Sequence, residues 1–161
     1  QLSAEAGTYY FKDFQIEAGS KANSYSEYGT TPIELCKIGN YQDYFYKDSD
    51  KWYLHKEIGK TVLDGTQTFS YNSTNQVFYI NFTGYLQTGF IPFCNYYQGV
   101  NSNSYSGVHE NEISCLRGID RIALKDTRYT DHTDLETWLS THNTKLYYVL
   151  STPTSEGIQV I

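Results

Sequence analysis

Hydrophobic and polar residues alternate along most of the chain in short runs, the pattern of β-strands buried on one face. Clusters rich in Asn, Asp, Gly and Ser separate these runs and indicate turns. We predict strands, in chain order, at Gly7–Glu17, Ile33–Lys37, Tyr41–Lys47, Lys51–Lys56, Lys60–Leu63, Gln67–Tyr71, Gln76–Phe82, Phe90–Tyr97, Glu112–Leu116, Ile119–Lys125 and Lys145–Leu150. Short strands that recur with turn signals predict an all-β fold, an antiparallel β-sandwich or jelly roll.

A β-hairpin around the turn Asp48-Ser49-Asp50 is the most clearly predicted local structure. Loops of three and of four residues both fit this turn, so the register stays open. On the returning strand, Trp52 and Leu54 share one face, while Tyr53 and His55 share the other. Trp52 beside Leu54 is typical of a core, which makes Tyr53 and His55 the better candidates for contact with a ligand.

One short α-helix is predicted near the C-terminus. Thr133 can cap its first turn, with Glu136 three residues later as the partner in a capping box. The apolar stripe that follows consists of Leu135, Trp138 and Leu139. The segment Asp131-His132-Thr133-Asp134 contains residue types used in catalysis, but its place at a helix start favours capping. The helix is expected to end near His142-Asn143.

The two ends of the chain differ in pattern from its middle. Residues 1–31 read as an N-terminal strand with alternating Phe14 and Ile16, followed by a small, polar, linker-like segment. Regular structure is expected to end at Ser151-Thr152-Pro153. The chain of 161 residues has the size of one domain, which we predict to span residues 1–161. It starts at Gln1 without a signal-like segment, and we expect it to be a fragment of a longer protein.

Composition narrows the class of partner. The formal net charge is -6 and no basic run exceeds two residues, which argues against nucleic-acid binding. No apolar stretch approaches the roughly 20 residues of a membrane span. Three separated cysteines without a Cys-x-x-Cys pair are expected to be small buried residues of a protein made in a reducing cytoplasm. The 17 tyrosines suit both pleated strands and recognition surfaces. Those expected to be mostly framework are Tyr41, Tyr44, Tyr46, Tyr79, Tyr147 and Tyr148.

Catalytic chemistry finds little support in the chain. There is no Gly-x-Ser-x-Gly motif and no His-x-x-x-His or His-x-His pair, so neither a serine hydrolase nor a metal centre is indicated. Acids near the hairpin, among them Asp43 and Glu57, interleave with lysines and are expected to form a solvated, charge-mixed surface. A structural calcium ion at Asp48-Ser49-Asp50 is conceivable, but the segment lacks the glycine and distal glutamate of an EF-hand. We therefore predict no cofactor, no metal and no enzyme activity.

The segment Cys94–Asn111 has the mixture of Asn, Ser, Gly and Tyr that is typical of evolved binding loops. Tyrosine rings stack on the apolar faces of sugar rings, and amide side chains pair with hydroxyl groups. The candidate saccharide-binding residues in this segment are Asn95, Tyr96, Tyr97, Tyr105 and His109. Tyr53 and His55 of the hairpin form a second candidate site.

Two stretches of sequence carry a resemblance to known proteins. Phe14–Gly29 resembles the ending of jelly-roll modules in phage tail and baseplate proteins. Ile33–Tyr44 and its continuation through Lys51–Gly65, with Thr137–Thr144 and Tyr147–Thr154, resembles the carbohydrate-binding modules inserted in evolved distal tail proteins of Lactobacillus phages. The resemblance covers nearly the whole chain except about Gln67–Asn111, and it implies no residue-level site.

This resemblance implies adhesion to a bacterial cell-wall polysaccharide by a module of the virion's tail tip or baseplate, made in the host cytoplasm and joined to other tail proteins through its parent chain. Repeated copies in a symmetric tail tip would raise a weak affinity by avidity. Two other hypotheses remain open. A purely structural tail domain would show an exposed apolar patch, and a glycosidase would show two carboxylates across a cleft.

Overall fold

The computed structural model describes residues 16–17 and 33–160 and divides them into short strands, two long strands and one α-helix. The elements are β1 (Ile16–Glu17), β2 (Lys37–Ile38), β3 (Tyr41–Gln42), β4 (Tyr44–Asp48), β5 (Lys51–Leu63), β6 (Ser70–Asn72), β7 (Val77–Asn81), β8 (Phe93–Cys94), β9 (Gln98–Gly99), the 3₁₀ turn η1 (Tyr105–Gly107), β10 (Glu112–Leu116), β11 (Arg121–Lys125), α1 (His132–Thr141) and β12 (Thr144–Val160). The fold is therefore all-β with one helix near the C-terminus, which confirms the predicted fold class. Except at β1, the predictions for residues 1–32 lie outside the described residues.

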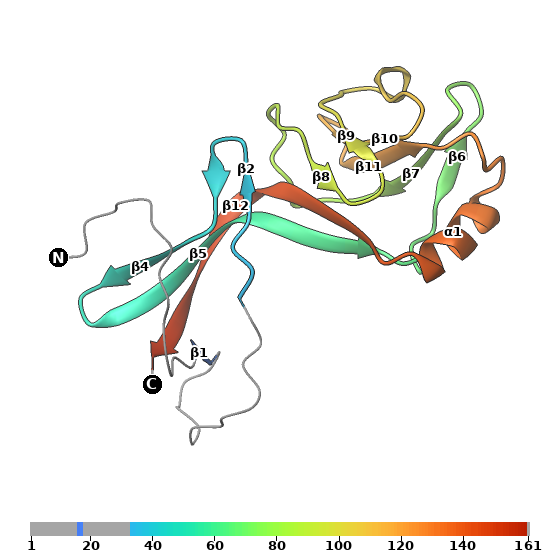
Figure 1. The fold of residues 1–161 in the computed structure, drawn as a ribbon. Coiled ribbons are helices and arrows are strands. Elements are labelled where there is room, and N and C mark those ends of the chain that lie inside the picture. Colours follow the sequence, from blue (N-terminus) through green and yellow to red (C-terminus); the bar gives the residue numbers. More distant parts are fainter. Residues whose placement is uncertain (1–15, 18–32, 161) are drawn as a thin grey trace.

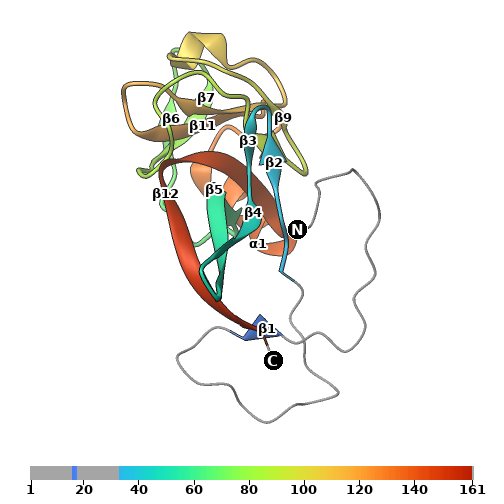
Figure 2. The ribbon, with the colours of Figure 1, turned by 90° about the vertical axis from the view of Figure 1, so that its left-hand side faces the viewer.

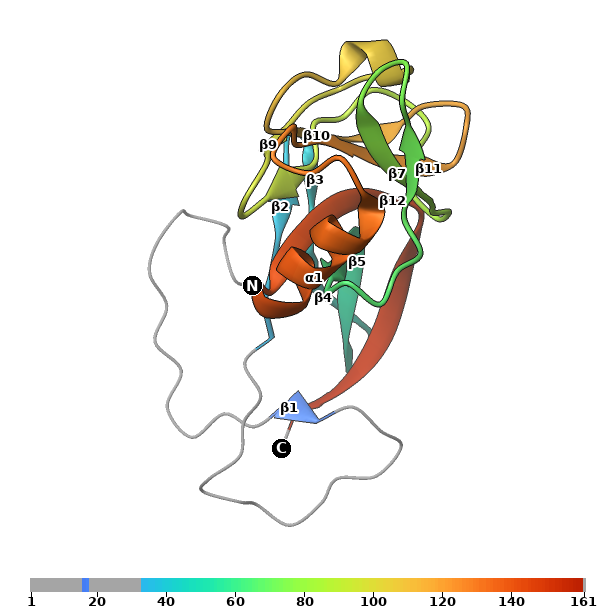
Figure 3. The same ribbon diagram turned by 90° about the vertical axis from the view of Figure 1, so that its right-hand side faces the viewer.

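The molecule consists of a compact head and a projecting arm, joined by β5 and β12 (Figure 1). In the arm, β4 and β1 flank the outer halves of these two long strands, in the order β1-β12-β5-β4. In the head, β8 adds to β12, and a second sheet runs in the order β6-β7-β11-β10-β9. α1 closes the end of the head that lies farthest from the arm (Figures 1 and 3).

A core between the two sheets of the head holds them together. Phe78, Ile122 and Leu124 of the second sheet, Leu63 and Leu146 of the first, and Leu135 and Leu139 of α1 are all fully buried. The opposite face of the second sheet is also covered, because Val77 and Leu116 pack there with Val108 from the long loop before β10. The strands β7, β10 and β11 are buried at consecutive positions and not at alternate ones, and they thus supply apolar side chains to both faces of this sheet.

A large irregularity in β12 separates the head from the arm. Val149 pairs with Ile58 and Thr154 pairs with Lys56, so four residues of β12 stand opposite the single residue Glu57. The excursion is held from the side, because Ser151 N donates to Gly84 O at 2.8 Å. Its last residue, Pro153, lies where no ladder N–H is needed. The strand was predicted to stop here, but it resumes and runs to Val160; Figure 2 shows how strongly it curves.

The carboxylate of Asp43 fastens the hairpin β2–β3 to β5 at the same level. Asp43 is 1% exposed. Its Oδ1 accepts hydrogen bonds from Glu57 N (2.9 Å) and Ile58 N (3.0 Å), and its Oδ2 accepts one from Cys36 N (3.2 Å). The prediction of a solvated, charge-mixed surface is therefore wrong for Asp43, whose charge is stabilised by three backbone donors.

The predicted hairpin and helix are both present, but the hairpin loop and the helix N-cap differ from the prediction. Asp48 pairs with Lys51, so the hairpin loop has two residues and is shorter than either loop that fitted the sequence. The N-cap lies two residues earlier than predicted, because Asp131 rather than Thr133 caps the helix and accepts from Thr133 N at 2.7 Å. Glu136 does not complete a capping box; its Oε1 accepts from Phe69 N at 2.9 Å and ties α1 to the loop before β6.

Candidate functional site

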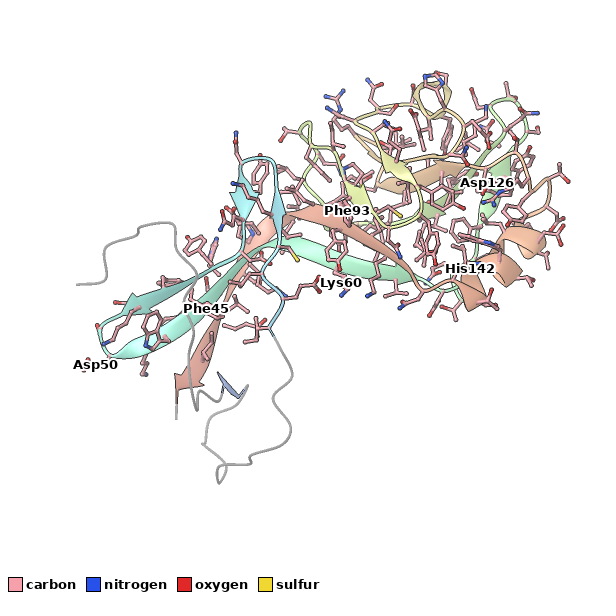
Figure 4. The ribbon with its side chains drawn as sticks, in the orientation of Figure 1. Phe45, Asp50, Lys60, Phe93, Asp126 and His142 are labelled. Carbon is pink, nitrogen blue, oxygen red and sulfur yellow. The ribbon has the colours of Figure 1, made fainter. Side chains whose placement is uncertain are left out.

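The residues predicted to bind a ligand do not form one site. The structure distributes them over the arm, the α1 end of the head, the outer face of the second sheet, and the core. Asp50 at the tip of the arm and His142 beside α1 mark the two extremes of the molecule in Figure 4. Each location differs in how much ring surface it leaves accessible.

On the arm, Tyr53 and His55 join two further aromatic residues across the β4–β5 ladder. Tyr44 pairs with His55, and their ring centroids lie 4.7 Å apart. Tyr46 pairs with Tyr53, and these rings stack at 5.2 Å with an interplanar angle of 17°. His55 Nδ1 also lies 3.0 Å from Ser155 Oγ on β12. Because the rings cover part of one another's faces, this surface leaves less flat area for a ligand.

At the α1 end, Tyr96 is 49% exposed and meets two aromatic residues that were predicted to have other roles. Its ring lies 5.2 Å from that of Trp138 and 5.8 Å from that of His142, nearly perpendicular to both. Trp138 and His142 stack on each other at 4.0 Å. Asn95 has a structural role beside them, since its Oδ1 accepts from Lys145 N at 2.7 Å. Of the two candidate residues Asn95 and Tyr96, Tyr96 is therefore the one that could contact a ligand, through its exposed ring.

Tyr97, which the sequence predicted to contact a saccharide, lies in the core instead. Its side chain is 4% exposed, and its hydroxyl donates to Asp126 Oδ2 at 3.1 Å. Burial and the neighbouring carboxylate raise the pKa of Tyr97 far above its ordinary value. Burial acts to raise the pKa of Asp126 as well, but hydrogen bonds from Arg128 and Tyr97 outweigh it and leave that pKa lowered. No face of the Tyr97 ring is available to a ligand.

Tyr105 and His109 lie on the outer side of the second sheet. The Tyr105 ring packs against Tyr79 at 5.1 Å, and its hydroxyl accepts a hydrogen bond from the guanidinium of Arg121. That guanidinium also lies over the Tyr79 ring, 4.6 Å from its centroid. His109 is exposed, and its backbone N–H donates to the carboxylate of Glu112 at 2.8 Å. Tyr105 is thus fixed by packing, and His109 stands apart from the other candidates.

A groove that the sequence did not predict lies where the arm meets the head. It has a volume of about 300 Å³ and is lined by Glu34, Cys36, Lys37, Ile38, Phe93 and Tyr147. Its floor is one rung of the sheet, because Phe93 and Lys60 both pair with Tyr147 and paired residues point to the same face. Its wall is the segment 33–38, which leads into β2. Figure 4 shows Lys60 and Phe93 at this junction.

Phe93 is the accessible aromatic residue of this groove. Its side chain is 60% exposed, and its ring lies 5.8 Å from the largely buried ring of Tyr147. β8 is an edge strand of two residues that follows Pro92, as the sequence predicted for a strand containing this proline. This edge position agrees with the exposure of the Phe93 side chain. The ring therefore presents a face to solvent beside the polar wall.

A charged pair stands next to this ring. Glu34 Oε2 accepts from Lys60 Nζ at 2.9 Å, and Glu34 Oε1 accepts from the Tyr147 hydroxyl at 2.8 Å. These two hydrogen bonds lower the pKa of Glu34, and the bond to Glu34 raises the pKa of Lys60. Lys60 also lies 5.2 Å from the centroid of the Tyr147 ring. The groove thus combines an exposed apolar ring with a fixed acceptor and a fixed donor.

Sequence reasoning missed this groove because its residues come from four distant segments. Phe93 carried one usable signal, since a bulky residue after Pro92 on an edge strand is expected to be exposed. Glu34 lies between the apolar residues Ile33 and Leu35, and nothing local distinguishes it from a solvated charge. Tyr147 was assigned to the framework, and it is both framework and groove floor.

The described residues form neither a metal centre nor a membrane-spanning helix. Within residues 33–160, no group of three or more His, Cys, Asp or Glu side chains is placed to hold a metal ion. Asp50, a candidate oxygen donor for calcium, lies 3.9 Å from Lys47 at the exposed tip of the arm. The helix α1, the single α-helix in the described part of the chain, is too short and too polar to cross a membrane.

Comparisons of the chain with protein-family models, with curated proteins and with solved structures find no match.

Proposed function

We propose that this chain is a non-catalytic carbohydrate-binding module of a phage tail, which attaches the virion to a saccharide on the host bacterial surface. The groove between segment 33–38 and the rung of Phe93 and Tyr147 is the proposed binding site. The observation that carries the proposal is the exposed ring of Phe93 beside the hydrogen-bonded pair of Glu34 and Lys60. The phage and tail assignment rests on the sequence resemblance.

The groove has the chemistry that a sugar ring needs. A pyranose presents an apolar C–H face, which stacks on an aromatic ring, and a rim of hydroxyl groups, which pair with charged acceptors and donors. Phe93 supplies the ring, Glu34 the acceptor and Lys60 the donor. A volume of about 300 Å³ lies at the small end of ligand pockets and suits a short stretch of glycan.

We propose a non-catalytic role because the groove has one carboxylate, Glu34, and because the pKa of Glu34 is lowered. It is the one carboxylate among the six lining residues, whereas glycosidases use two across the scissile bond. A general acid also needs a raised pKa. Hydrogen bonds from Lys60 and Tyr147 lower the pKa of Glu34 instead, so it acts as an ionised acceptor at neutral pH.

A fluorescent fusion of the chain tests this proposal on intact host cells. We expect Phe93→Ala to reduce cell labelling by at least about fivefold without unfolding, because aromatic anchors carry much of a binding energy. Tyr96→Ala is the control, since that ring is also exposed but packs against Trp138 and His142 and is not among the residues that line the groove. Loss of labelling in Tyr96→Ala, with Phe93→Ala unaffected, would move the site to α1. Labelling that survives stripping of the surface polysaccharide would contradict the proposal.

A second candidate function is a structural contact with neighbouring tail proteins. Large apolar side chains surround the groove: Ile91 is 60% exposed and Leu35 is 46% exposed. Such a patch is expected at a protein interface. If it docks on a tail protein, Ile91→Ser will impair assembly of the tail while purified protein retains its binding to host polysaccharide. The reverse outcome, intact assembly and lost saccharide binding, favours the carbohydrate-binding role.

A further inference from the structure

The charge around the groove is opposite in sign to that of the chain. The chain has 18 acidic residues and 12 Lys and Arg residues, and its net charge is -6. Four of its lysines nevertheless surround this one groove. Lys37 lines the wall and Lys60 stands on the floor rung. Lys56 lies four residues before Lys60 on β5, and Lys145 lies two residues before Tyr147 on β12, so both share the faces of those floor residues.

The lysines act on the groove's own titratable groups, as their positions require. Lys60 and Lys145 both contribute to the lowered pKa of Glu34. For the Cys36 thiol, burial raises the pKa, the charges of Glu34 and Asp43 add to that rise, and Lys56 and Lys60 oppose it. Lysine charges therefore act on both groups in the groove, although at the Cys36 thiol the charges of Glu34 and Asp43 outweigh those of Lys56 and Lys60.

The carboxylates near these lysines already form hydrogen bonds or ion pairs within the protein. Glu34 is neutralised by Lys60 at 2.9 Å. Asp43 is buried, and its carboxylate is held by three backbone N–H groups. Glu57 belongs to the opposite face of β5, where its carboxylate accepts from Gln42 N and lies 4.0 Å from His55. Against the two carboxylates that act on the groove thiol, Glu34 and Asp43, four lysines leave an excess of two positive charges.

We propose that the ligand of this groove is an anionic glycan, whose repeating unit carries phosphate or carboxylate groups. This inference rests on the proposed saccharide-binding function and specifies its ligand class. The anionic group lies between Lys37, Lys60 and Lys145, and the adjoining sugar ring stacks on Phe93. Lysines grouped at one groove of a protein with a negative net charge favour both selectivity and orientation, since an anion is repelled by the net charge of the chain and attracted by these lysines.

Three polymers test the ligand class by calorimetry on the complete 161-residue chain: poly(glycerol phosphate), polygalacturonate and neutral dextran. We expect one or both anionic polymers to bind at least about tenfold more tightly than dextran, and the affinity to fall as salt rises from about 50 to about 500 mM because ions screen exposed charges. Binding of the phosphate polymer alone, or of the uronate alone, identifies which anionic group the lysines recognise.

Substitutions locate the effect in the groove. Lys37→Gln and Lys145→Gln are each expected to weaken binding of the anionic polymer about two- to fivefold, as for partly exposed charge pairs. Lys51→Gln, at the tip of the arm, is the matched control and should change nothing. Glu34→Gln gives the sharpest readout, because it removes the charge that pairs with Lys60. It should strengthen binding of an anionic polymer, whereas a neutral ligand would exchange a charged acceptor for a weaker, neutral one and bind more weakly.

The failure of this inference and that of the proposed function give different results. If dextran and the anionic polymers bind equally, Phe93→Ala weakens all of them and the lysine variants do not, the groove binds saccharide but its preference for anions is overturned. If none of the three polymers nor purified host polysaccharide binds, the proposed function fails and this inference falls with it.

Discussion

The head and the arm use the same residue type, tyrosine, in opposite ways. In the head, Tyr85 is 1% exposed; its hydroxyl donates to Leu116 O at 2.6 Å and accepts from Arg121 N at 2.8 Å. In the arm, Tyr46 and Tyr53 stack side by side on a single sheet, and Tyr44 is 45% exposed. The head buries tyrosines between layers, while the arm has only cross-strand contacts to order them. Composition alone therefore cannot separate framework tyrosines from binding tyrosines.

This comparison predicts that the head dominates the free energy of unfolding. Leu124→Ala should destabilise the chain by about 2–5 kcal/mol, because it opens a cavity between two packed layers. Leu54→Ala in the arm should cost less, since Leu54 is 6% exposed but lies outside both clusters of buried core residues. Equilibrium denaturation in guanidinium chloride measures both values. Equal losses would show that the arm is packed as tightly as the head.

The junction between the two regions depends on Asp43. Asp43→Ala leaves three backbone N–H groups without their acceptor and should cost about 2–3 kcal/mol. The control is Asp50→Ala, since that carboxylate lies at the exposed tip. Hydrogen exchange should localise the change at Glu57 and Ile58. A uniform loss of protection in head and arm would instead join the two regions into one cooperative unit.

Trp52 offers a test within the arm. The sequence predicted a core residue, but the side chain is only half-buried on the outer part of β5. Trp52→Ala should therefore cost about 1–2 kcal/mol, below the 3–5 kcal/mol range of a fully buried aromatic residue. The same denaturation experiment reports it. A loss at the top of that range would contradict the half-buried position of the ring.

The head has a pH-dependent contribution from Asp126. Its lowered pKa means that the ionised form stabilises the fold above the unfolded pKa of about 3.9, and that this stability is lost as pH falls through the folded pKa. Asp126→Asn should thus be less stable than the original chain at pH 7, and the gap in Tm should shrink below about pH 4. A gap that is constant from pH 7 to pH 2.5 would contradict this assignment.

The smallest expected effect is on the rate at which a maleimide modifies the Cys36 thiol in the groove wall. Cys94 and Cys115 are buried, and burial raises the pKa of Cys115 to about 12, while Cys36 is half-buried in the groove wall. Cys36 should therefore be the thiol that a maleimide labels in the folded chain, slowly at neutral pH because its raised pKa leaves little thiolate, and faster as the pH rises. A bound glycan should slow that reaction. Cys36→Ser, which should abolish the labelling, is the control.

Local patterns predicted much of the framework. The alternation around Asp48-Ser49-Asp50 identified the hairpin, and the stripe of Leu135 and Leu139 identified the helix, because both depend on neighbours in sequence. The continuation of β12 beyond Pro153 could not be predicted, since only pairing with β5 makes the strand resume. The groove was out of reach for the same reason. Its residues, from Glu34 to Tyr147, meet only through tertiary pairing.

The four-residue excursion of β12 has a mechanical consequence for a module that adheres through the groove. Force applied between Tyr147 and the tip of the arm runs along β12 and loads the β5–β12 hydrogen bonds in shear, because ladder bonds lie perpendicular to the strands. The three surplus residues opposite Glu57 are stored length, worth about 10 Å when extended. Because β5 is continuous opposite the excursion, these residues can extend only after one of the two ladders slides along β5, and they then release length before the chain becomes taut.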